Sequence, residues 1–395
     1  MENRFAQLRE LLCCEPSAGA WEALLRFFFH WSSQELSSDI LDYAASHLLA
    51  WNDELRILQT HAEYDDCVYD SSDYYNEPYF DEDESEDESG PTSSEFEEAA
   101  TNASESGVLD ALSEDEAEDE RSLWQLFESE PSHPCWGLVR SLHIQLQAMQ
   151  SEAFDILDDF SSLHVLHVDF SPVEWNSREA FQTSIDGDDL LAFEIQELRN
   201  EFLSLKNIKG IEKISSCKAL RELHFHHFCL VSLEGFPEHP TCSKFFLDVH
   251  SPLLHLEPLE QWSSLEDLHI EGSRRIRNVK AITRCKKLRS IELTYSPHIW
   301  DGALFVGLDE LAELSLIGAS ELESVDELEK LPSLHTINLS DCRALEDCKG
   351  LMELPLLKRL ELPEQAMHWP YVTATSMHSR ESVQKLQDAM KAIEW

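Results

Sequence analysis

The segment LEDLHI at residues 265–270 sets a pattern that four later segments repeat: LRSIEL (288–293), LAELSL (311–316), LHTINL (334–339) and LKRLEL (357–362). Each segment has large apolar residues at its first, fourth and sixth positions, and each begins 23 residues after the previous one. Self-similarity at a fixed period of about 20–50 residues is typical of proteins built from one repeated supersecondary unit. These segments therefore decide the fold of this part of the chain.

At the end of each segment, apolar residues alternate with other residues. This two-residue period is typical of a strand with one buried face. The rest of the unit must bring the chain back to start the next strand about 4.8 Å away. An apolar residue also stands three positions before most units, at Cys217, Trp262, Cys285, Leu308, Leu331 and Leu354. Because free cysteine is among the most buried residue types, we expect Cys217 and Cys285 to be core residues.

The same register continues upstream with less regularity. Clear units stand at Leu220-Leu223-Phe225 and Cys242-Phe245-Leu247, and weaker copies at Val139-Leu142-Ile144, Leu163-Leu166-Val168 and Leu190-Phe193-Ile195. The steps between these copies vary from 22 to 30 residues, so the early units carry insertions. The regular part of the predicted solenoid is therefore its last seven units, from Leu220 onward.

This pattern resembles the 22–24-residue class of leucine-rich repeats. The resemblance covers about 225 of the 395 residues and implies an α/β solenoid, with a parallel β-sheet on the concave face and turns or short helices on the convex face. The family often has Asn three residues after the last strand leucine, whereas this chain has Ser273, Ser296, Ala319 and Cys342. The hydrogen bonds of those turns must then come from other groups.

Four segments are predicted along the chain. Residues 1–62 have apolar residues at helical spacing and are expected to form a small helical domain. Residues 63–120 form an acidic linker, residues 121–370 the solenoid, and residues 371–395 a capping segment. Within the last of these, Val383, Leu386, Met390 and Ile393 predict one helix over 379–395 that closes the open end of the solenoid, as solenoids require.

The linker holds much of the chain's formal net charge of −47. Between Glu63 and Glu120 there are 24 acidic residues and no Lys or Arg. Mutual repulsion and a scarcity of branched aliphatic residues predict disorder, and Ser85 and Ser113 each precede Glu-Asp-Glu, a context that suits an acidophilic kinase. Nucleic-acid phosphates and anionic membranes repel a chain with this much negative charge. We therefore expect neither nucleic acid nor a membrane as a partner.

Several other classes of protein are disfavoured by the sequence. No signal peptide and no apolar run long enough to span a membrane is seen, so we expect a cytoplasmic protein with reduced thiols. No CxxC occurs, and the motifs GxSxG, HExxH, GxxxxGK[ST] and GxGxxG are missing. We therefore expect neither an enzyme nor a bound cofactor.

Candidate binding residues lie between the buried positions of the strands, where side chains point to the concave face. This face is rich in histidine and carboxylate over the early units, and stacked strands should join such residues into one stripe. The candidates for contact with a partner are His167, Glu194, His224, His226, Phe246, Asp248, His269, Glu271 and Glu292.

Three interpretations of this stripe stay open. It is a binding surface for a basic protein or peptide, with His224, Phe246, Asp248 and His269 near its centre; or an ordinary solvated face; or a metal site. The metal interpretation uses His224, His226 and His269 with Asp248 or Glu271, and it is disfavoured because an open sheet face rarely locks its ligands in place. We therefore predict no metal.

The leading functional hypothesis is a non-enzymatic interaction module or adaptor that binds a basic protein or peptide on the concave face. A second hypothesis assigns the activity to residues 63–120, as an acidic chaperone or mimic that sequesters basic proteins such as histones. A third hypothesis is a regulatory subunit that recruits an enzyme.

Overall fold

The computed structural model describes residues 2–32, 36–59, 121–145, 154–160, 162–170, 210–228, 233, 235–249, 253, 255–272, 276, 279–296 and 298–393. The chain divides into two compact units, Met1–Trp136 and Gly137–Trp395. Three predictions lie outside the described residues: the acidic linker with Ser85 and Ser113, the weak repeat at Leu190-Phe193-Ile195, and the candidate residue Glu194.

Short helices make up most of the first unit. Its elements are α1 (Glu2–Leu12), α2 (Ala18–Phe29), α3 (Ser38–His47), the 3-10 helices Leu48–Ala50 and Asp53–Leu55, β1 (Ile57–Gln59) and α6 (Leu123–Ser129). α2 begins where Ser17 Oγ accepts a hydrogen bond from the amide of Ala20, which satisfies one of the unpaired amides of the first turn. α6 begins with a capping box formed by Ser122 and Gln125.

Aromatic residues form the core of this unit. Phe27 packs against Trp31 edge to face, with ring centroids 5.5 Å apart, and Trp21 is buried on α2. The indole Nε1 of Trp21 donates a hydrogen bond of 2.7 Å to the carbonyl of Ile57. This bond ties β1 to α2. The segment Ile57–Gln59 was expected within a helical domain and is a strand.

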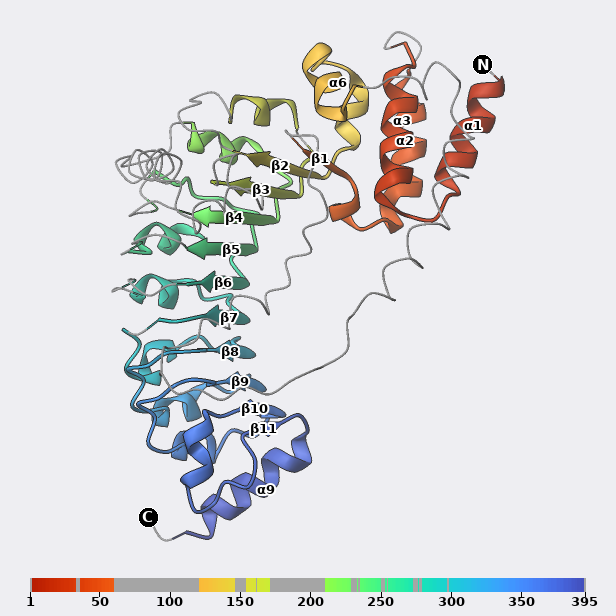
Figure 1. Ribbon diagram of the computed structural model, residues 1–395. Coiled ribbons are helices and arrows are strands. Elements are labelled where there is room, and N and C mark those ends of the chain that lie inside the picture. The colour runs from red at the N-terminus through yellow and green to blue at the C-terminus, as the bar shows by residue number, and fades with distance from the viewer. Residues whose placement is uncertain are drawn as a thin grey trace, which may run out of the picture. The chain divides into compact units, whose positions relative to one another are not determined.

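The second unit is a stack of strands in sequence order (Figure 1). The strands are β2 (Ser141–Gln145), β3 (Val165–Asp169), β4 (Glu222–Phe228), β5 (Lys244–Val249), β6 (Asp267–Glu271), β7 (Ser290–Leu293), β8 (Glu313–Ser315), β9 (Thr336–Asn338), β10 (Arg359–Glu361) and β11 (Ser376–Met377). β2 to β10 are parallel, and β11 pairs with β10 in the antiparallel sense. A parallel sheet in sequence order, one strand per repeat, is the architecture of a leucine-rich-repeat solenoid.

The register of the sheet follows the apolar pattern of the sequence. Leu268 pairs with Ile291, Ile291 with Leu314, Leu314 with Ile337 and Ile337 with Leu360, so each partner lies 23 residues further along the chain. All five side chains are buried. A slip of one residue would turn each of them to the other face of the sheet, so burial fixes the register.

One early part of the register differs from the prediction. The sequence placed a weak unit with Glu194 between the units of His167 and His224, but β3 pairs directly with β4. His167 therefore has His224 as its partner in the sheet. The chain between these two strands is long enough to contain a further unit, and the local apolar pattern could not reveal that β3 and β4 are neighbours.

Short 3-10 helices lie along the other side of the stack (Figure 1). In the second unit they are Asp155–Asp159, Ile211–Ser216, Glu257–Gln261, Lys280–Arg284, Gly302–Phe305, Asp326–Lys330, Lys349–Leu351 and Glu364–His368; a further one, Pro134–Leu138, spans the junction of the units. Cys217 and Cys285 follow two of these helices and are fully buried, as predicted. Burial raises the pKa of each thiol to about 11, so both thiols stay protonated at neutral pH.

Other groups bond the turns in which the family's Asn is missing. The thiol of Cys342 donates to the carbonyl of Leu316 (3.1 Å), and the hydroxyl of Thr294 accepts from the amide of Gly272 (2.9 Å). Ser296 and Ala319 are buried, so small side chains fill these two positions.

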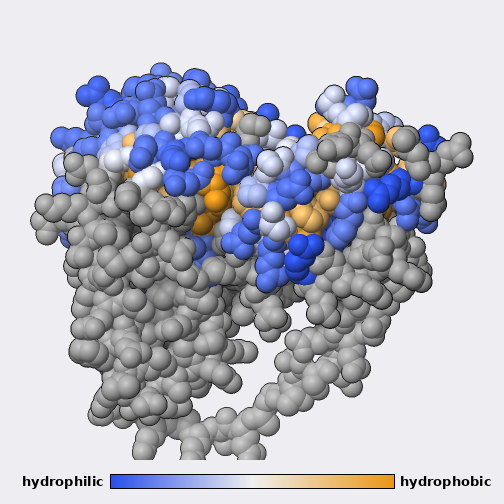
Figure 2. Space-filling view, turned by 90° about the horizontal axis from the view of Figure 1, so that it is seen from above, coloured by the Kyte–Doolittle hydropathy of each residue, from blue (hydrophilic) through white to orange (hydrophobic). Residues whose placement is uncertain are grey.

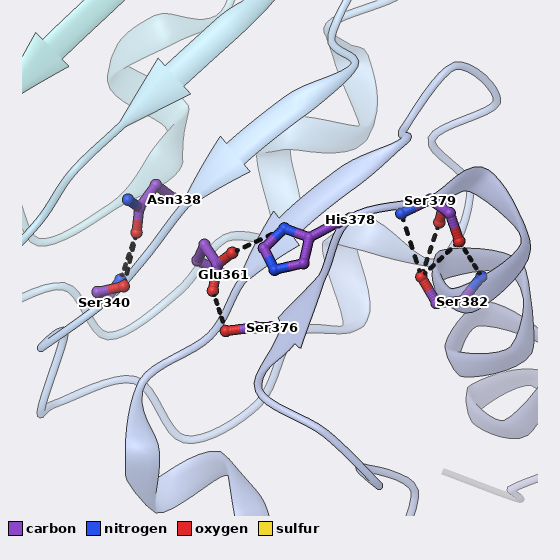
Figure 3. Close-up of polar contacts among 7 residues, drawn as sticks. All are labelled: Asn338, Ser340, Glu361, Ser376, His378, Ser379 and Ser382. Carbon is purple, nitrogen blue, oxygen red and sulfur yellow. Dashed lines mark hydrogen bonds and ion pairs between the residues drawn. The ribbon is translucent and has the colours of Figure 1, made fainter.

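The C-terminal end of the sheet is covered by β11 and by α9 (Arg380–Lys391). Ser379 and Ser382 form the capping box of α9 (Figure 3). Val383, Leu386 and Met390 are buried, as the apolar stripe predicted, whereas the helix ends at Lys391, before Ile393. The coloured residues in Figure 2 are mainly hydrophilic, with smaller hydrophobic patches among them.

Candidate functional site

The centre of each strand contributes one side chain to the concave face, which we define as the strand positions that alternate with the buried apolar residues. Pairing places these side chains in one continuous row across the sheet, because parallel neighbours share a register. The central row contains His143, His167, His224, Phe246, His269, Glu292, Ser315, Asn338 and Glu361.

Four imidazoles gather at the start of the central row. We call His143, His167, His224 and His226 the histidine cluster. The rings of His167 and His224 stack with centroids 4.3 Å apart, and those of His167 and His226 are nearly parallel at 5.5 Å. His167 Nδ1 and His226 Nε2 lie 3.1 Å apart and share a hydrogen bond, while the ring of His143 is 5.7 Å from that of His167.

Within the histidine cluster, His226 is poorly suited to carrying positive charge. Burial, followed by the nearby imidazole of His167, lowers the pKa of His226 to about 4, although Asp169 acts in the opposite direction. His226 is therefore neutral at physiological pH, with one ring nitrogen a hydrogen-bond donor and the other an acceptor.

Phe246 separates the histidine cluster from His269. Its ring stacks on His224 at 4.3 Å with an interplanar angle of 7°, and it tilts toward His269 at 5.7 Å. The set of His224, His226 and His269, which the sequence offered only as a disfavoured metal site, is therefore not brought together, because the side chain of Phe246 lies between His224 and His269.

A charged pair stands beside the cluster on β4 and β5. Lys244 Nζ lies 2.8 Å from Glu222 Oε1, and His224 Nε2 lies 3.8 Å from Glu222 Oε2. The imidazole of His224 and the ammonium of Lys244 lower the pKa of Glu222 to about 2. The shorter contact is the one to Lys244, whose charge is thus largely balanced within the protein.

A second pair joins β6 and β7. His269 Nδ1 lies 3.1 Å from Glu292 Oε2. Burial would lower the pKa of His269, but the hydrogen bond to Glu292 and the nearby charges of Glu271 and Asp248 outweigh it and raise that pKa. The same bond lowers the pKa of Glu292.

A hollow of about 390 Å³ opens on the concave face over β5 to β8, and we call it the charged hollow. It is lined by Lys244, Phe246, Asp267, Leu268, His269, Arg289, Ser290, Glu292, Ala312 and Glu313. Burial, followed by the opposing charge of Lys244 and the like charges of neighbouring carboxylates, leaves the pKa of Asp267 raised. The hollow thus brings Phe246 together with three carboxylates, those of Asp267, Glu292 and Glu313, and with the basic side chains of Lys244 and Arg289.

The candidate residues named from the sequence fall in three groups. His167, His224 and His226 meet in the histidine cluster, and Phe246, His269 and Glu292 line the charged hollow or its rim. Asp248 and Glu271 are partners in the register of β5 and β6, on the same face.

Three charged residues that line the hollow were not among the candidates from the sequence. Lys244, Asp267 and Glu313 stand two positions before the central residues Phe246, His269 and Ser315. Because strand side chains alternate, residues two apart share a face. That spacing is the signal that could have identified them.

No protein-family model matches the sequence, and no curated protein matches it. Similar solved structures include a leucine-rich-repeat protein from Leptospira interrogans, which is 19% identical over 53% of this chain and 56% of that chain, with a TM-score of 0.31. An internalin from Listeria monocytogenes is 13% identical over 53% of this chain and 64% of that chain (TM-score 0.29). The leucine-rich-repeat domain of the type III effector XopL is 15% identical over 68% of this chain and 86% of that chain, with a TM-score of 0.27.

This chain spans less than two thirds of the first two of these structures. Its own sheet register and buried apolar ladder establish the repeat fold. Among the described residues, no helix has the length and apolar character needed to cross a membrane.

Proposed function

We propose that this protein binds a basic protein or peptide on its concave face, at the charged hollow. The observation that carries this proposal is the position of Phe246 in a hollow flanked by Asp267, Glu292 and Glu313. The fold is usually non-catalytic and typically serves protein interaction, which agrees with a role as an adaptor or scaffold.

The chemistry of the hollow favours a Lys or Arg side chain. Carboxylates at the rim can accept charge-assisted hydrogen bonds from the ammonium or guanidinium of such a side chain. Lys244 opposes this little, because Glu222 already pairs with it at 2.8 Å. Arg289 likewise lies between Glu266 and Glu310, with nitrogen–oxygen distances of 3.8 and 3.5 Å.

A selection from a random peptide library against the full chain tests the proposal. We expect enrichment of peptides with Lys or Arg, and loss of their binding by about tenfold or more when Phe246→Ala or Glu292→Lys is introduced. Selected peptides that are neutral or acidic, or that bind both variants as well as the wild type, would contradict it.

The matched control is Glu329→Lys. Glu329 is exposed on the 3-10 helix Asp326–Lys330, so this substitution changes the net charge by the same amount as Glu292→Lys but away from the concave face. Binding that falls equally in both charge variants would indicate general electrostatics and not a site in the charged hollow.

The acidic segment supports a second candidate function, because 24 carboxylates within residues 63–120 could themselves hold a basic protein. Deletion of 63–120 distinguishes the two. Retained peptide binding supports the charged hollow, whereas complete loss supports an acidic mimic or chaperone.

A further inference from the structure

Three histidines of the concave face converge in a way that the proposed function does not use. His167 on β3 and His224 and His226 on β4 each offer a ring nitrogen, and these three atoms all lie within 4.8 Å of one another. They are brought together by the direct pairing of β3 with β4, in which His167 is the partner of His224.

The spacing of two of these nitrogens is close to that of two ligands of one ion. Zinc binds imidazole nitrogen at about 2.0–2.1 Å in tetrahedral geometry, which puts two such nitrogens about 3.3–3.4 Å apart. His167 Nδ1 and His226 Nε2 are 3.1 Å apart. An ion bound by both nitrogens would replace this hydrogen bond, and the ring that donates it would bind the ion in its other tautomer, with the proton on its other nitrogen.

The surroundings also hold the rings in place. Stacking with His167 on one side and Phe246 on the other fixes the ring of His224, at 4.3 Å in both contacts. Two carboxylates are within reach as outer partners: Glu222 lies 3.8 Å from His224 Nε2, and the buried Asp169 is the register partner of His226. Carboxylates beside metal-binding imidazoles orient the rings and strengthen their binding.

We propose that His167, His224 and His226 form a binding site for a divalent transition-metal ion, with Zn²⁺ as the ion that fits best and a fourth position open to water. Three imidazole ligands suit zinc and its neighbours among the transition metals, whereas Ca²⁺ and Mg²⁺ require oxygen ligands. The set differs from the one considered from sequence: His167 takes the place of His269, which lies beyond Phe246.

Titration of full-length protein with Zn²⁺ in competition with a chromophoric chelator tests this site. The wild type should bind one equivalent tightly, and His226→Gln and His167→Gln should each weaken that binding by about tenfold or more, since even second-shell changes typically cost 10–100-fold. The matched control is His269→Gln, on the same face but outside the set, which should leave the affinity unchanged.

X-ray absorption of the Zn²⁺-loaded wild type provides a readout that does not depend on any variant. A nitrogen/oxygen shell with imidazole scattering is expected. A sulfur shell would assign the ion to cysteines such as the exposed Cys13, and equal affinity in all three variants would assign it to carboxylates. Either result overturns the proposal, as does a wild-type protein that binds no equivalent of Zn²⁺ tightly.

This inference is independent of the proposed function, because Zn²⁺ alone is the probe. Loss of peptide binding in Glu292→Lys with retained Zn²⁺ binding, or loss of Zn²⁺ binding in His226→Gln with retained peptide binding, would separate the two.

Discussion

At the scale of single residues, the pair of His269 and Glu292 makes the stability of the solenoid depend on pH. The native pKa of His269 is raised, so its contribution is complete below its ordinary value of 6.5 and is lost as pH rises through the native pKa. The native pKa of Glu292 is lowered, so its contribution is present above 4.5 and is lost as pH falls through the native pKa. The pair therefore stabilises the fold most between these two ordinary values.

The substitution Glu292→Gln removes the charged partner of His269 but leaves the burial of His269 unchanged. We expect the pKa of His269 to fall, measured by NMR titration of its ring protons, and we expect the decline in Tm above pH 6.5 to become shallower. Glu329→Gln, on an exposed helix away from the concave face, should change neither. An unaltered titration of His269 in Glu292→Gln would show that the 3.1 Å contact does not exist in solution.

Gly350 allows two neighbouring turns to approach closely. A Cβ atom added to it would lie 2.0 Å from the carbonyl oxygen of Val325 and 2.4 Å from Cα of Asp326, both backbone atoms that cannot move aside. Gly350→Ala should therefore destabilise the protein by about 3 kcal/mol or more in urea unfolding.

Gly19 provides the control for that change. It lies in α2 with nothing within 4 Å of its added Cβ, so Gly19→Ala should be neutral or stabilise by up to about 1 kcal/mol. Comparable stability of the two variants would contradict the close approach at Gly350.

At the scale of elements, the sequence was sufficient for the regular strands and insufficient for their irregular neighbours. A fixed 23-residue period identified β6 to β10, because each strand repeats the same local pattern. The pairing of β3 with β4 is a long-range property, and no local pattern distinguishes it from a stack with an extra strand between them. The histidine cluster follows from that pairing, so its membership could not be read from the sequence.

The charged hollow was only half predictable for a related reason. Its histidine, aromatic and carboxylate residues stood out at the strand centres, but Lys244 and Asp267 belong to the position two residues earlier. The two-residue spacing places both side chains on the concave face. Which side chains they lie next to on the neighbouring strands depends on the register of the sheet.

α9 should protect the last repeats more than the early ones. The buried side chain of Gln387 donates to the carbonyls of Leu351 (2.8 Å) and Leu354 (3.1 Å) and so joins α9 to the last repeat. Gln387→Ala should cost about 1–3 kcal/mol, and hydrogen exchange should rise in β9 and β10 but not in β5, because repeats contact mainly their neighbours. Lys385→Ala, on the exposed side of the same helix, should have little effect, and uniform exchange along the sheet would contradict a capping role.

At the scale of the whole molecule, the charge of −47 should dominate how a basic partner arrives. Electrostatic steering is screened by salt, with a Debye length that falls from about 10 Å at 0.1 M to 3 Å at 1 M. Affinity for a basic peptide, measured by fluorescence anisotropy, should fall roughly tenfold or more between about 50 and 500 mM salt. Unchanged affinity would limit recognition to the apolar contact with Phe246.

The antiparallel strand β11 has a consequence for behaviour at high concentration. A parallel sheet that ended at β10 would present unpaired backbone groups on which a second copy could add its own strands and grow into a filament. β11 instead occupies that edge with only Ser376–Met377, in the opposite chain direction, and Ser376 Oγ and His378 both contact Glu361 (Figure 3). Pairing of this edge with a second copy is thereby disfavoured. Removal of residues 371–395 should make the protein aggregate more than the full chain does at the same concentration.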